Sequence, residues 1–135
     1  MSKSMKINPD WPWLEKYPMT QCVKAGNTLY ISGQVAVDPE GNIVGTGDMA
    51  TQARQVFDNM EAVLAEAGAT LDDVVKITVF IKDLQQFADF AKVRAKNFSS
   101  GLPASTAVEV NSLLFPELLL EVEAIAKIGS GGESQ

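Results

Sequence analysis

The fold is decided by residues 74–82, which read VVKITVFIK. Val, Ile, Thr and Phe favour strands, and apolar side chains here occupy both alternating sets of positions. Residues 118–128, LLLEVEAIAKI, show a similar alternation, interrupted by Glu121 and Glu123. These two stretches predict strands at the centre of a sheet, with apolar side chains on both of its faces.

Helices and shorter strands are expected on either side of these stretches. Apolar residues at helical spacing follow Asp48, a good N-cap, and stop at Gly68. A second helix is expected from about residue 84 to Phe98. Further strands are expected over residues 19–24, 28–32, 35–44 (a hairpin with its tip at 38–42) and 104–110.

The resulting order, β-β-β-β-α-β-α-β-β, predicts an α+β fold with both helices on one face of a mixed sheet of about six strands. No element remains to cover the other apolar face, and such a face usually marks an interface, so we expect a homo-oligomer. Residues 1–128 are expected to form one domain. Prolines and aromatic residues make 1–17 an extended N-terminal segment, and 129–135 read as a flexible tail.

Composition excludes several classes of function. The 135 residues are 46% hydrophobic, which is typical of one globular domain. The net charge of -6 argues against nucleic-acid partners and against an anionic membrane surface. The chain has no histidine, which removes Ser-His-Asp catalysis and imidazole metal sites, and we expect no metal. The lone Cys22 allows no internal disulfide and indicates a reduced, cytoplasmic setting.

Two carboxylates interrupt the apolar strand at 118–128. Glu121 and Glu123 share a face with Leu119 and Ile125. Burial would raise the pKa of such a carboxyl group, which suits a general acid or base. The other interpretation is a solvated stripe, or a carboxylate satisfied by backbone amides. Glu109, on the preceding strand, is a third candidate of the same kind.

Three further places could bind a ligand. Ser32-Gly33 interrupts a strand, which indicates either a bulge or a close backbone approach to a ligand. Ser105 and Thr106 begin a strand after a turn, where hydroxyls either hold an anion or carbonyl or merely shape the loop. Arg94 shares a helix stripe with aromatic residues, as an ordinary salt-bridge partner or as an anion-binding group.

Several segments together resemble the RidA (YjgF) family. They are residues 29–34 (LYISGQ), 51–55 (TQARQ), 72–83 (DDVVKITVFIKD), 103–104 (PA) with 108–110 (VEV), and 121–126 (EVEAIA). The resemblance runs in order over nearly all of residues 18–128. It implies a chorismate-mutase-like fold and a closed homotrimer around a central barrel, with pockets at the subunit interfaces. It also implies hydrolysis of reactive enamines and imines, such as 2-aminoacrylate, to 2-oxo acids and ammonia without a metal or organic cofactor.

The family's site residues carry over only in part. Glu121, the carboxylate expected to orient or activate water, is present, as are Gly33 and its neighbour Ser32. The arginine that grips the substrate carboxylate is replaced by Ser105, and the tyrosine expected near the pocket by Met19. The resemblance therefore implies a divergent branch that lacks this arginine.

Other family positions differ as well. An asparagine and a cysteine of the family correspond to Ala91 and Ala107, and Arg54 matches a different helix arginine. Arg94 is a possible substitute for the missing charge.

We therefore expect a RidA-type hydrolase of altered specificity. Glu121 would be catalytic, and the substrate-binding residues would be Ser32, Gly33, Ser105, Thr106, Arg94 and Met19. The alternative is a trimer that binds a metabolite or regulates a partner protein without chemistry. A ribonuclease or translation-inhibitor role, attached to some family names, is disfavoured by the acidic charge and the absence of histidine.

Overall fold

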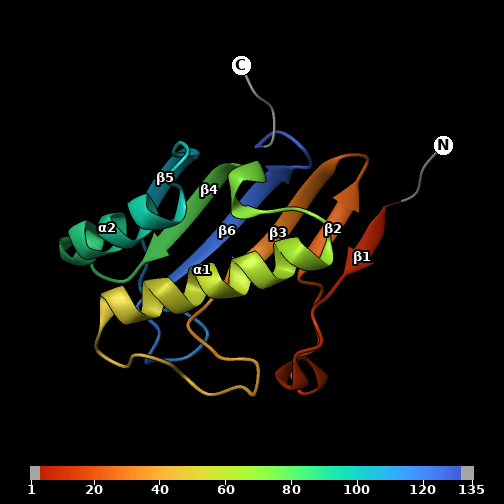
Figure 1. Cartoon of the computed structure of the whole chain (residues 1–135). Coiled ribbons are helices and arrows are strands. Elements are labelled where there is room, and N and C mark those ends of the chain that lie inside the picture. The colour runs from red at the N-terminus through yellow and green to blue at the C-terminus, as the bar shows by residue number, and fades with distance from the viewer. Residues whose placement is uncertain (1–3, 132–135) are drawn as a thin grey trace.

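A single six-stranded sheet forms the centre of the computed structural model, which describes residues 4–131 (Figure 1). The spatial order of its strands is β1-β2-β3-β6-β4-β5. Neighbouring strands are antiparallel except β4 and β5, which are parallel. The strands are β1 (Met5–Ile7), β2 (Cys22–Ala25), β3 (Thr28–Gln34), β4 (Val74–Ile81), β5 (Ala104–Glu109) and β6 (Leu120–Lys127).

Two α-helices and three short 3-10 helices complete the described chain. They are α1 (Met49–Glu66), α2 (Phe87–Asn97), η1 (Pro12–Glu15), η2 (Leu71–Asp73) and η3 (Leu84–Gln86). The Asp48 side chain accepts a hydrogen bond from Thr51 N and caps α1, and Gly68 follows the helix with a φ of +79°. Both ends of this helix were expected. Within residues 4–131, the helices are too short or too polar to cross a membrane.

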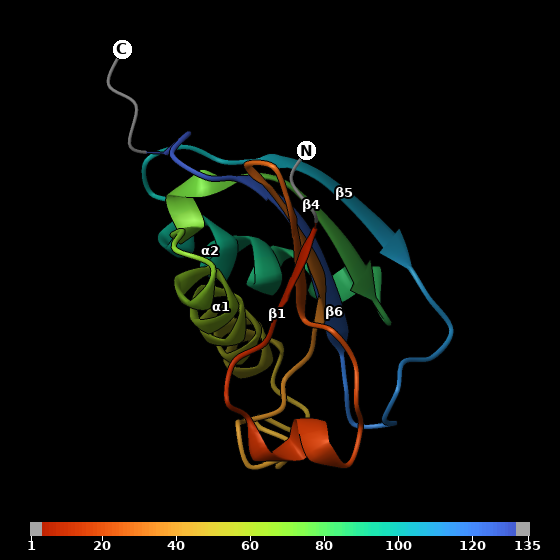
Figure 2. The ribbon, with the colours of Figure 1, turned by 90° about the vertical axis from the view of Figure 1, so that its right-hand side faces the viewer.

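Both α-helices lie on one side of the sheet, and no other helix of residues 4–131 covers the opposite side (Figure 2). The core lies between the helices and the sheet, where Phe57 of α1 stacks on Phe90 and meets the edge of Phe98. The α+β fold with two helices on one face is therefore confirmed. The opposite face, which we call the open face, carries the half-exposed Tyr30 together with Phe80 and Val108.

The predicted hairpin over residues 35–44 is present in a shortened form without regular strands: Val44 N donates to Ala36 O and Asp38 N donates to Asn42 O, both at 2.9 Å. A single bridge joins Val37 to Ile43, and the rest of the segment is a loop. The buried Asn59 side chain of α1 donates to the carbonyl oxygens of Val35 and Val37, at 2.9 and 2.8 Å. A helix side chain thus satisfies backbone groups that a strand ladder would otherwise pair.

The described segments near the two termini, residues 5–15 and 129–131, are more ordered than expected. Residues 5–7 form β1, which pairs with β2 at the sheet edge, and η1 follows it. At the other end, Gly131 N donates to Asp73 Oδ1 at 2.9 Å, and Ser130 Oγ donates to Lys127 O at 2.8 Å. The last four residues of the expected flexible tail, 132–135, lie outside the described residues.

Candidate functional site

The Ser32-Gly33 interruption is a bulge in β3. The register with β6 runs from Ile31, opposite Ala124, to Gln34, opposite Val122, and leaves Ser32 and Gly33 without partners in β6. Ser32 Oγ donates to Thr20 O at 2.6 Å. The bulge is therefore anchored to the segment that precedes β2.

Two buried amides support this anchor. Gln34 Nε2 donates to Gln21 Oε1 at 2.8 Å and to Ser32 O at 3.0 Å. Both side chains are almost fully buried. Gln21 was not predicted as part of the site, and the available signal was an amide beside the strand residue Cys22. Its Oε1 accepts the bond from Gln34, whereas its Nε2 is buried without a hydrogen-bond partner among residues 4–131. The Gln34–Gln21 and Gln34–Ser32 bonds hold the bulge in one geometry.

Glu121 lies directly against this bulge. A Cβ atom built on Gly33 would fall onto Glu121 Oε2 and within 2.7 Å of its Cδ and Cγ atoms. Glycine leaves room for the carboxylate in this position, and any residue with a Cβ would make the end of the Glu121 side chain move away. The close backbone approach expected at Gly33 is thus made by Glu121 of the same chain.

The environment of Glu121 changes its acidity. The side chain is half-buried on the open face, and this desolvation raises the pKa of its carboxyl group above the ordinary value. The negative charge of the neighbouring Glu123 raises the pKa further. Glu123 itself is exposed. A carboxyl group whose pKa is raised toward neutrality is suited to giving and taking protons.

Apolar and hydroxyl side chains surround Glu121 on the open face. Phe80 of β4 lies opposite Glu121 in the sheet register, with Val108 of β5 next in the row. Thr78 and Thr106 form the neighbouring row opposite Glu123. Thr106 therefore shares a face with Glu121, as the sequence analysis requires of a substrate-binding residue.

Arg94 and Ser105 form a second group at the β5 edge, on the helix side of the sheet. Arg94 Nη1 donates to Ser105 Oγ at 3.2 Å. The guanidinium lies 5.5 and 5.6 Å from the ring centroids of Phe87 and Phe90, within cation–π range. Its Nε is buried without a hydrogen-bond partner among residues 4–131. A planar cation with spare donors is suited to binding a carboxylate.

The single chain does not bring these two groups together. Ser105 pairs with Ile77, whose side chain is buried beneath the helices, whereas Glu121 lies on the open face. The remaining candidate, Met19, is exposed and immediately precedes the Thr20 carbonyl that holds Ser32. Met19 is thus the neighbour in sequence of Thr20, whose carbonyl holds the bulge beside Glu121.

Glu109 is not a candidate of the same kind as Glu121. It lies on the helix side of β5, because it pairs with Ile81, and it is exposed. Its Oε2 accepts a hydrogen bond from Leu84 N at 3.0 Å. The carboxylate therefore holds the start of η3.

The fold and the half-buried carboxylate define an α+β protein with a candidate acid–base site. The sequence model of the family described as Endoribonuclease L-PSP matches residues 15–128. A RutC family protein of Pyrococcus horikoshii is 46% identical over 109 residues, which cover 81% of this chain and 86% of the relative. The chain belongs to this family, which includes the RidA, YjgF and RutC proteins.

Two further relatives are informative. The crystal structure of yeast Mmf1 superimposes with a TM-score of 0.86 at 35% identity, covering 93% of this chain and 99% of that one. A protein of Dermatophagoides farinae named 2-iminobutanoate/2-iminopropanoate deaminase is 37% identical over 111 residues, covering 82% of this chain and 86% of the relative. Family members thus include a named imine deaminase.

Proposed function

We propose that this protein hydrolyses reactive imines or enamines to carbonyl compounds and ammonia, with Glu121 as its catalytic acid and base. The observation that carries the proposal is the Glu121 carboxylate, half-buried against the Gly33 bulge with a raised pKa. The deaminase named among its relatives supports the same reaction class.

Hydrolysis of an imine requires mainly that the protein transfer protons between water and nitrogen. Water adds to the imine carbon as a carboxylate removes one of its protons, and the carbon–nitrogen bond then breaks as nitrogen is protonated. One imine and one water give one carbonyl compound and one ammonia, with no change of oxidation state. Glu121 takes one proton from the attacking water and gives it to the imine nitrogen, which yields a carbinolamine. It then takes the remaining hydroxyl proton and gives it to the amine nitrogen as the carbonyl forms and the carbon–nitrogen bond breaks. A raised pKa favours both transfers.

A second subunit completes the site in this proposal. Glu121 with Gly33 and Arg94 with Ser105 lie on opposite sides of one sheet, so one small molecule cannot reach both groups within a single chain. The open face, which mixes the exposed Tyr30 and Val108 with polar side chains, lacks cover from residues 4–131, and covering it with a second copy would bury its apolar part. We propose a homotrimer, in which Glu121 of one subunit meets Arg94 and Ser105 of a neighbouring subunit.

Arg94 would then hold the polar end of the substrate. Ser105 is too short to bind a carboxylate in two places, but it receives a hydrogen bond from a guanidinium that has a further buried donor. Substrate preference between charged and neutral imines therefore depends on Arg94. Thr106 and Ser32 are placed on the open face and at the bulge, with Met19 at its margin.

The test compares Glu121→Gln with Glu123→Gln. The control lies two residues away on the same strand and face, but its carboxylate is exposed. Imines are generated in situ, both 2-aminoacrylate and a neutral imine, and ammonia release is measured above the uncatalysed rate. We expect Glu121→Gln to lower kcat about 10²- to 10⁴-fold, as is typical of removing a general acid–base group. Glu123→Gln should stay within about threefold of wild type, and light scattering should give the same oligomer for all three proteins.

Two outcomes contradict the proposal. Full activity of Glu121→Gln would remove Glu121 from the chemistry. A wild-type protein that accelerates neither imine would favour the alternative, a trimer that binds a metabolite without turning it over. Tight binding of a 2-oxo acid without ammonia release would then identify that role.

A further inference from the structure

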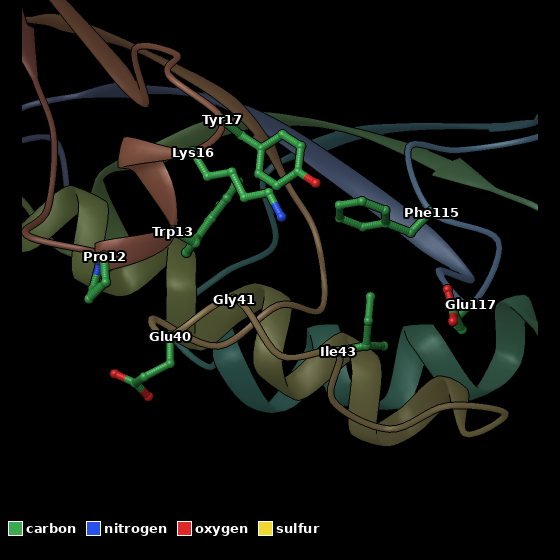
Figure 3. A pocket seen from close by; sticks show the side chains of 9 residues that line it. All are labelled: Pro12, Trp13, Lys16, Tyr17, Glu40, Gly41, Ile43, Phe115 and Glu117. Atoms are coloured by element: carbon green, nitrogen blue, oxygen red, sulfur yellow. The ribbon is translucent and has the colours of Figure 1, made fainter.

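A cavity of about 470 Å³ lies at the end of the sheet where η1, the loop at 40–43 and the loop before β6 meet (Figure 3). Its size is in the range of small-molecule sites in proteins. None of its lining residues belongs to the Glu121 group or to the Arg94 group. Nothing in the proposed imine chemistry uses this cavity.

Aromatic rings form its walls. Trp13 and Tyr17 come from the N-terminal segment, and Phe115 comes from the loop before β6. The Tyr17 ring lies 6.3 Å from that of Trp13 and 5.8 Å, edge to face, from that of Phe115. Ile43 closes the opposite side. These half-buried surfaces suit a flat apolar group.

The loop opposite η1 is built to approach Trp13 closely. Gly41 has a φ of +95°, and a Cβ added there would lie 3.1 Å from Trp13 Cβ. Trp13 N donates to Pro39 O at 3.4 Å. The indole Nε1 of Trp13 is buried without a hydrogen-bond partner among residues 4–131. The fold thus fixes the position of this wall.

The charged groups around the cavity determine the sign of the charge that a ligand should carry. Lys16 reaches into the cavity, and its Nζ lies 5.6 Å from the Tyr17 ring centroid (Figure 3). Of the two lining carboxylates, that of Glu40 points away from the cavity and Glu117 lies beyond Phe115. An anion that enters between the rings therefore meets an ammonium group first.

We infer that this cavity binds a small aromatic carboxylate, with its ring between Tyr17, Phe115 and Ile43 and its carboxylate on Lys16 Nζ. Apolar walls with a single inward cation are the complement of such a molecule. The inference does not depend on the proposed imine hydrolysis.

Phenylacetate is the probe, and tryptophan fluorescence is the readout. The two tryptophans of the chain, Trp11 and Trp13, lie in or next to η1, with ring centroids 6.4 Å apart. We expect saturable binding with a Kd of about 1 mM or lower. Phenylacetamide, the neutral isostere, should bind about tenfold more weakly because it loses the charge-assisted hydrogen bond.

Two variants test the assignment of the ring and of the charge. Lys16→Met should weaken phenylacetate about tenfold and leave phenylacetamide unchanged, whereas Lys92→Met, on the exposed side of α2, should change neither. Phe115→Ala should weaken both ligands. Glu121→Gln should retain phenylacetate binding, because Glu121 does not line the cavity.

Several results would overturn the inference. One is tighter binding of phenethylammonium than of phenylacetate, which would assign the cavity to cations through Glu40 and Glu117. Another is unchanged phenylacetate binding in Lys16→Met, and a third is the absence of saturable binding. Loss of binding in Glu121→Gln would place the ligand at the acid–base site instead, and this result differs from any failure of the proposed imine hydrolysis.

Discussion

Replacing Gly33 by alanine perturbs the contact between the β3 bulge and Glu121. The new methyl group would overlap Oε2 of Glu121 and lie 2.7 Å from its Cδ and Cγ. These carbons must retreat by about 0.7 Å to reach the ordinary contact distance of 3.4 Å. The φ of Gly33 is not positive, so the strain comes from this overlap and not from the backbone conformation.

The expected cost follows from overpacking. Forcing one extra carbon into a well-packed core typically costs about 1–3 kcal/mol. Here the cost should lie at or below the low end of that range, because the atoms that must move are the end of a flexible, half-buried side chain. Glu121→Ala removes the three overlapping atoms, so alanine at Gly33 should cost almost nothing in that background. The coupling free energy between the two positions should therefore be about 0.5–1 kcal/mol, the lower part of the range for residues in direct contact.

The assay is a double-mutant cycle measured by urea unfolding at one fixed protomer concentration, because association contributes to apparent stability. Wild type, Gly33→Ala, Glu121→Ala and the double variant form the cycle. A parallel cycle with Glu123→Ala is the control, since the three atoms nearest to a Gly33 Cβ all belong to Glu121. Its coupling should be close to zero.

Equal costs of Gly33→Ala in the wild-type and Glu121→Ala backgrounds would refute the contact. Equal coupling in both cycles would also refute it, because the effect would then be general to the strand. If the contact is real and the proposed function holds, Gly33→Ala should also lower kcat, since Glu121 is displaced from the bulge.

Three further predictions concern stability and reactivity. Because the pKa of Glu121 is raised in the folded state, its contribution to folding is full at low pH and is lost as the pH rises through the folded pKa. Glu121→Gln should therefore unfold at a higher urea concentration than wild type at neutral pH, and the difference should shrink below pH 4.5, the ordinary pKa of the group. Gln52→Met should cost about 2–3 kcal/mol in urea unfolding, and Gln85→Met nothing measurable, because the buried Gln52 amide bonds Gly45 O, Glu117 O and Leu119 N. Burial raises the pKa of the Cys22 thiol, so a disulfide reagent should modify it only after unfolding, and fast modification of the native protein would contradict this.

Local sequence patterns predicted most of the secondary structure. The periodicity after Asp48 gave α1 with its cap, and the β-branched run at 74–82 gave β4, because propensity and hydrophobic period agree there. The turn over 35–44 was predicted, but the lack of regular strands on either side of it was not. Two of its carbonyl groups are bound by Asn59, which is distant in sequence and becomes a partner only when α1 packs against the sheet.

The candidate site was likewise predicted in part from local sequence patterns and in part seen only in the structure. Strand alternation placed Glu121 and Glu123 on one face with Leu119 and Ile125, and the glycine in a strand indicated a bulge or a close approach. That this face is the open one came from the structure. That the carboxylate rests on Gly33, and that Arg94 reaches Ser105, depends on which strands and helices are neighbours.

The sequence by itself determined the elements, the family resemblance and the types of side chain available for chemistry, because these follow from local spacing and composition. Only the tertiary structure decided which distant residues meet. Strand order and register put Glu121 and Ser105 on opposite faces of the sheet. The packing of the loops brings the Tyr17 and Phe115 rings together at the cavity. Such contacts arise from the packing of the whole chain, and no local pattern encodes them.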